Sequence, residues 1–89
     1  MRAVITVIGK DTVGILAKVS TICAQYNANV IDVTQTVMQD MFAMIMLTDI
    51  SKIDPDLSVL VDRMNELGKD QQLSIHVMHE DIFNSMHTI

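Results

Sequence analysis

Basic and aromatic residues are scarce in this 89-residue sequence. Six lysines and arginines stand against eleven acidic residues, for a formal net charge of −5, and aromatic residues make up only 3% of the chain. Nucleic-acid binding depends on basic side chains that neutralise phosphates, and RNA-binding sheets also need exposed aromatic rings on which bases stack. We therefore expect no nucleic-acid partner.

Cysteines and long hydrophobic runs are lacking as well. A single cysteine allows neither an intramolecular disulfide nor a Cys-x-x-Cys metal loop. No apolar run approaches the roughly 18 residues that a membrane-spanning helix requires. The apolar stretch after Arg2 stops at Lys10 and Asp11, and no small-residue cleavage site of a signal peptide follows it. The sequence therefore predicts a cytoplasmic protein with no membrane partner.

Hydrophobic residues are plentiful, at 49% of the chain. This proportion is too high for a disordered chain and is enough for one packed core. At this length the core is not divided, so we expect a single domain over residues 1–89. A core of this size leaves a small margin of stability, which partner chains would increase.

Hydrophobic periodicity predicts four strands and two helices. Alternation and β-branched residues mark the strands, which are residues 2–8, 30–38, 42–50 and 72–78. Apolar residues at helical spacing mark the helices, which are residues 14–26 and 55–68. We expect Asp11 or Thr12 to cap the first helix, Asp54 to cap the second with Pro55 in its first turn, and Gly68 to end it.

The order of these elements is βαββαβ, followed by a tail over residues 79–89. Short connections and right-handed crossovers place both helices on the same side of the sheet. The sequence therefore predicts an α+β, ferredoxin-like fold. It consists of a four-stranded antiparallel sheet, with the first strand central, two helices on one face, and a short C-terminal helical tail.

The second and third predicted strands carry apolar side chains on both faces. In the second strand Ile31, Val33 and Val37 alternate with Val30 and Met38, and in the third Ala43, Ile45 and Leu47 alternate with Phe42, Met44 and Met46. A monomer with one solvated face would show polar residues there. We therefore expect both faces to be buried, the second by a partner chain together with the tail, whose Ile82, Phe83 and Met86 fall on one side. This predicts a homodimer.

The segment from Gly9 to Leu16, Gly-Lys-Asp-Thr-Val-Gly-Ile-Leu, joins the first strand to the first helix. The free N–H groups around Gly14 and Ile15 lie at the positive end of a helix and suit a carboxylate. Asp11 beside them can accept a hydrogen bond from an ammonium group, and the two sites together describe a free α-amino acid. The alternative is structural: the glycines shape a tight turn and Asp11 caps the helix.

This segment, extended to Ser20 and followed by Asn-Ala-Asn-Val-Ile-Asp over residues 27–32, resembles the ACT domain, a regulatory module of amino-acid metabolism. It is most similar to the single-domain subgroup related to the glycine-cleavage regulator proteins. The resemblance implies that an amino acid binds at a dimer interface, between the first loop of one chain and the second strand of the other. The implied ligand-binding residues are Asp11, Thr12, Val13, Gly14, Ile15 and Asn29. Val13 replaces a frequent proline, and Asp11 replaces the asparagine of serine-binding members.

These observations predict a homodimeric regulatory module that binds an amino acid or related metabolite and acts on a partner protein. The alternative is an assembly module that binds other protein chains but no ligand.

We find no catalytic constellation, so we expect no enzyme, no catalytic residue and no cofactor. Cys23 lies on an apolar helical stripe and is expected to pack in the core. For His76, His79 and His87 the spacing favours structural or surface roles, so we expect no metal site.

Overall fold

The computed structural model describes residues 1–10 and 14–86. The elements in these ranges are β1 (Arg2–Gly9), α1 (Ile15–Gln25), β2 (Asn29–Met38), β3 (Met41–Asp49), α2 (Leu57–Gln71), β4 (Ser74–His79) and α3 (Glu80–Met86). Asp11, Thr12 and Val13, and likewise His87, lie outside the described residues. The predicted element order and the helical tail are confirmed.

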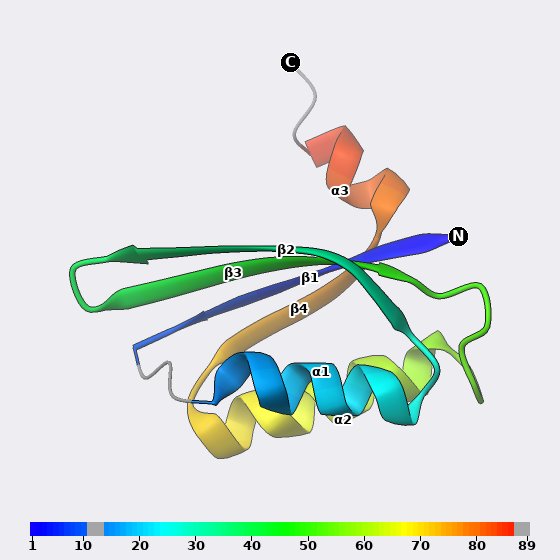
Figure 1. Cartoon of the computed structure of the whole chain (residues 1–89), viewed down its shortest axis with the longest axis horizontal. Coiled ribbons are helices and arrows are strands. Elements are labelled where there is room, and N and C mark those ends of the chain that lie inside the picture. Colours follow the sequence, from blue (N-terminus) through cyan, green and yellow to red (C-terminus); the bar gives the residue numbers. More distant parts are fainter. Residues whose placement is uncertain (11–13, 87–89) are drawn as a thin grey trace.

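The strands form one sheet in the order β2-β3-β1-β4, and every neighbouring pair is antiparallel. Both α1 and α2 cover the same face, which we call the helix face, and α3 lies on the other side of the sheet, the open face (Figure 1). Strand β1 is central, between β3 and β4. The predicted ferredoxin-like α+β fold is confirmed.

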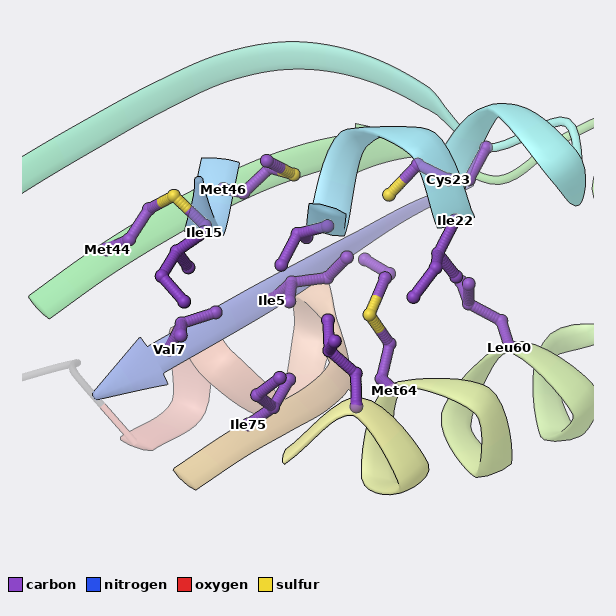
Figure 2. Close-up of a cluster of buried hydrophobic side chains, with 14 of the residues drawn as sticks. Ile5, Val7, Ile15, Ile22, Cys23, Met44, Met46, Leu60, Met64 and Ile75 are labelled. Carbon is purple, nitrogen blue, oxygen red and sulfur yellow. The ribbon is translucent and has the colours of Figure 1, made fainter. Parts of the chain in front are cut away.

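The core lies between the helix face and the two helices (Figure 2). Alternate residues of β1 contribute Ala3, Ile5 and Val7, all fully buried. The helices contribute apolar stripes, from which Ile15, Val19, Ile22, Cys23, Leu60 and Met64 are buried. Burial raises the pKa of the Cys23 thiol to about 11, so the thiol stays neutral at physiological pH. Cys23 thus packs as a small hydrophobic residue, as expected.

The predicted alternation of β2 is wrong at its start, because the strand has a bulge. Val30 pairs with Thr48 and Asp32 pairs with Leu47, so Ile31 is the extra residue. A bulge of one residue shifts the side chains that follow it to the opposite face. Val30 and Val33 therefore both pack against the core, whereas Ile31 is 48% exposed.

Within a single chain only one face of β3 is fully buried. Phe42, Met44 and Met46 lie on the helix face and are at most 4% exposed. On the open face Ile45 is 44% exposed, because α3 has only seven residues and contacts β1 and β4 rather than the whole sheet. An apolar strip remains uncovered along the centre of this face.

Two predicted boundaries of α2 need correction. The N-cap is Asp56, not Asp54, and its Oδ1 accepts hydrogen bonds from the Val59 N–H (3.2 Å) and the Ser58 hydroxyl (2.6 Å). Gly68 does not end the helix, which continues to Gln71 with Gln72 at the C-cap. Position 68 is instead a point of close approach: a Cβ there would lie 2.9 Å from the carbonyl oxygen of Leu73.

Gly68→Ala is expected to destabilise the protein, although alanine ordinarily favours a helix over glycine by about 1 kcal/mol. The added methyl group would push α2 away from the backbone that leads into β4, and overpacking of this kind costs about 1–3 kcal/mol. Urea unfolding followed by circular dichroism measures the difference. Lys69→Ala, at an exposed neighbouring position of the same helix, is the control and should leave stability nearly unchanged. Equal or higher stability for Gly68→Ala would contradict the close approach.

Candidate functional site

The start of α1 is shaped by Gly14, which occupies the N-cap position. Its φ of 74° lies in the left-handed region that favours glycine, and no side-chain hydrogen bond is made from this cap. Among residues 1–10 and 14–86, a Cβ at Gly14 would have only the Lys18 Cε within reach, at 4.0 Å, so none of these residues crowds its backbone. Ile15 is 2% exposed and its side chain belongs to the core. What this end of the helix offers to a ligand is backbone N–H groups.

The other end of α1 leads to Asn29, the first residue of β2. Asn27 has a φ of 60°, the left-handed conformation in which asparagine commonly ends a helix. Asn29 is exposed and lines a surface hollow of about 600 Å³, which we call the Asn29 hollow. This hollow lies between α1 and the edge strand β2, and its lining residues are Ser20, Ala24, Asn27, Ala28, Asn29, Val30 and Lys52.

Helix α1 separates the two ends of the predicted site within one chain. Its 11 residues, at about 1.5 Å of rise per residue, span about 16 Å. Gly14 lies before the first turn and Asn29 follows the last, so the two residues are at opposite ends of the molecule's helix layer (Figure 1). A single amino acid is too short to contact both. The described residues of one chain therefore do not bring Gly14 and Asn29 together around one amino acid.

The polar groups beside the Asn29 hollow are arranged by the pairing of β2 with β3. Asn29 pairs with Asp49, so the chain that leaves β3 brings Ser51 and Lys52 next to Asn29. The Ser51 N–H donates to the Asp49 Oδ1 (2.9 Å), and the Met1 ammonium donates to the Ser51 hydroxyl (3.1 Å). These groups keep the carboxylate charged: the hydrogen bonds from Ser51, with help from the N-terminus and Lys52, lower the pKa of Asp49.

Lys52 was not among the residues that the sequence analysis singled out. It lies in the loop between β3 and α2, over 20 residues from Asn29 in sequence, and nothing in its immediate neighbours marks it. Only the β2–β3 register, Asn29 opposite Asp49, brings it to the site. Only a correct prediction of the pairing register between β2 and β3 could thus have identified Lys52 from the sequence.

The histidines do not assemble into a site in the part of the chain described. His76 pairs with Thr6 and faces the open side, whereas His79 pairs with Ala3 of the helix face, so the two side chains point to opposite faces. The His76 Nε2 lies 3.2 Å from the Ser74 hydroxyl, and the His79 Nδ1 accepts a hydrogen bond from the Asp81 N–H at 3.1 Å. Within residues 1–10 and 14–86, no three His, Cys, Asp or Glu side chains are grouped to hold a metal ion.

A second hollow lies between α3 and the open face. Its volume is about 350 Å³, and it is lined by Thr6, Ile8, Ala43, Met44, Ile45, His76, Met78, Phe83 and Met86. An ion pair between Arg2 and Glu80 ties the start of α3 to β1. Around the hollow Ile8 and Ile45 remain 45% and 44% exposed. Here the open face offers mostly apolar surface.

Comparisons with known proteins agree with this architecture. The sequence profile of the ACT domain family matches residues 2–78. A UPF0237 protein of Clostridium perfringens is 52% identical over 89 residues, with the whole of both chains aligned. The structure superposes on an ACT domain protein from Streptococcus pneumoniae with a TM-score of 0.79 and 34% identity, over 93% of each chain. A putative glycine cleavage system transcriptional repressor gives a TM-score of 0.70 and 26% identity, over 85% of this chain and 43% of that one.

None of the helices within residues 1–10 and 14–86 is long and apolar enough to cross a membrane.

Gly14→Ala is expected to destabilise the fold by about 1–2 kcal/mol, because a side chain makes the left-handed conformation of this N-cap unfavourable. Gly14→Asn is the matched comparison, since asparagine tolerates that conformation better, and its cost should be smaller. Thermal and urea unfolding show which of the two variants loses more stability. If Gly14→Ala were as stable as the wild type, the left-handed cap would be refuted.

Proposed function

The chain belongs to the ACT domain family, whose members are small regulatory ligand-binding modules, and from this we propose that it binds an α-amino acid or a related metabolite at a homodimer interface. Occupancy of the site is passed to a partner protein, and the module itself catalyses no reaction. The observation that carries the proposal is the separation of Gly14 from Asn29 by the full length of α1. A site that uses both residues needs two chains.

A dimer whose two-fold axis lies beside β2 would bring Gly14 of one chain close to Asn29 of the other. Strand β2 is at the edge of the sheet, so its outer side is available to a second copy, and the flank of α1 with Ser20 and Ala24 faces the same way. Two copies related in this way have their α1 helices antiparallel and side by side. The Gly14 end of one helix then meets the Asn29 hollow of the other, and the dimer has two equivalent sites.

In each site the ligand's two charged groups have separate partners. The α-carboxylate is held by the backbone N–H groups at Gly14 and Ile15, at the positive end of α1. The α-ammonium is held by Asp11, and Thr12 and Val13 are assigned to the same site. Asn29 of the second protomer supplies an amide that both donates and accepts hydrogen bonds. The residues of the loop come from one protomer and Asn29 from the other.

Assembly through the open face is a second candidate function, and it uses a different interface. Ile8 and Ile45 are nearly half exposed there, beside Met86 of the tail at 65%. An apolar patch on a sheet commonly marks a protein–protein contact. Two open faces packed together would leave both α1 helices on the outside, so this interface brings no Gly14 next to an Asn29. It supports assembly without a ligand, or a further contact between ligand-binding dimers.

Titration calorimetry of the purified protein against the free amino acids tests the proposal. We expect saturable binding of at least one of them, at one ligand per protomer, and a dimer in sedimentation experiments. Asn29→Ala should weaken binding by about 3- to 10-fold through the loss of a neutral hydrogen bond, while Asn65→Ala, an exposed asparagine on α2, should not. A folded dimer that gives no heat with any amino acid would favour the assembly candidate instead.

A mixed dimer distinguishes a shared site from a site within one chain. We expect Asp11→Ala and Asn29→Ala homodimers each to bind weakly. A mixed dimer isolated with two affinity tags should regain one site of wild-type affinity, because one of its sites then carries both substitutions and the other carries none. If every site lay within a single chain, each would carry one substitution, and the mixed dimer would recover nothing.

A further inference from the structure

We infer that the ligand of this site is an α-amino acid with an anionic side chain and that Lys52 selects it. The inference rests on the proposed function, because it assigns the part of the ligand that enters the Asn29 hollow. The residues that carry it are Lys52, Asn27, Asn29 and Asp49, all at the end of the sheet where β2 begins and β3 ends.

Lys52 lines two adjoining hollows at this end of the molecule. The Asn29 hollow, of about 600 Å³, and a smaller one of about 230 Å³ share Asn27, Asn29 and Lys52. The larger hollow has no carboxylate among its lining residues, and its polar side chains are two amides, the Ser20 hydroxyl and the Lys52 ammonium. These groups include several hydrogen-bond donors and one full positive charge, which is a lining that suits an anion.

Lys52 and the N-terminal ammonium offset the carboxylate of Asp49 at this corner, although the whole chain carries −5. The carboxylate of Asp49 lines the smaller hollow and is already bonded to the Ser51 N–H. Two cations face that single carboxylate: the N-terminal ammonium, which is bonded to Ser51, and Lys52. No ion pair joins Lys52 to any carboxylate within residues 1–10 and 14–86, so its ammonium is available to a ligand.

The carbonyl end of α1 lies beside the Asn29 hollow and would by itself favour a cation. Its carbonyl oxygens are largely occupied by backbone donors. The Ala28 N–H donates to Cys23 (2.8 Å), the Asn27 N–H donates to Ala24 (3.3 Å), and the Asp54 N–H donates to Tyr26 (3.0 Å). The full charge of Lys52 therefore outweighs the partial charge of the helix end.

In the proposed dimer the Lys52 ammonium lies on the side of the ligand that is opposite its α-carboxylate and α-ammonium groups. The α-carboxylate and α-ammonium groups are held by the loop at Gly14 of one protomer, so the side chain points across the interface toward the other. There it meets the Asn29 amide and the Lys52 ammonium. A carboxylate or phosphate in that position gains a charge-assisted hydrogen bond, which is about twice as strong as a neutral one. An uncharged side chain gains less, and a cationic one is repelled.

Calorimetry with six ligands tests the assignment: L-glutamate, L-aspartate, O-phospho-L-serine, L-glutamine, L-serine and L-lysine. We expect one of the anionic ligands to bind at least about 10-fold more tightly than its neutral counterpart, and L-lysine to bind most weakly. The comparison of glutamate and aspartate with phosphoserine tells a carboxylate ligand from a phosphate one. Raising the salt concentration should reduce the difference in affinity between the anionic ligands and their neutral counterparts.

Three variants test whether the preference for an anionic ligand depends on Lys52. Lys52→Met keeps most of the length of the side chain without its charge and should remove the preference for an anionic ligand. Lys52→Glu should shift the preference toward L-lysine. Lys69→Met, which removes an exposed lysine on α2, is the control and should behave like the wild type. Thermal unfolding checks that all three are folded, as expected for exposed positions.

The outcomes separate this inference from the proposal on which it rests. Binding of amino acids without a preference for the anionic ones, or a preference that survives in Lys52→Met, overturns the role of Lys52 and leaves amino-acid binding intact. An absence of binding for every amino acid overturns both. A preference lost in Lys52→Met and kept in Lys69→Met supports both.

Discussion

The architecture depends on the burial of one face of the sheet beneath two helices. Ile5 and Val7 of the central strand and Met46 of β3 are completely buried there, and the helices close over them with Val19 and Leu60. Because this burial supplies most of the apolar surface that the chain removes from water, α1 must run back across the sheet from the end of β1 to the start of β2. The opposite face is left to α3, which is too short to cover it.

Periodicity predicted the elements that bury a single face. The stripe of Ile15, Val19 and Ile22 marks α1 because every third or fourth residue must face the sheet. Periodicity failed where one residue broke the pattern, as at the β2 bulge, since the bulge depends on pairing with β3. It also failed at Gly68, where the backbone of Leu73 comes close. Such features arise from contacts between elements, which a sequence read segment by segment does not contain.

The same distinction applies to the site. Gly14 could be singled out because it marks the turn before α1, and Asn29 because of the resemblance to the ACT domain. Lys52 could not, since its place depends on the register that sets Asn29 opposite Asp49. The position of a charge matters more here than the total: at physiological ionic strength the field of a surface charge fades over about 8 Å. A chain of net charge −5 can therefore still present a local cation to a ligand.

The proposed division of the site between two chains would have a thermodynamic consequence. The length of α1 keeps Gly14 and Asn29 apart in a single chain, so the monomer would hold only half of the contacts of the proposed site. A ligand that binds both halves binds the dimer better than the monomer, and by linkage it shifts the equilibrium toward the dimer by the same factor. A rise in ligand concentration then increases the fraction of the chains that are in the dimer. A partner protein that recognises a surface formed only by the paired α1 helices and β2 edges would thereby respond to the ligand without touching it.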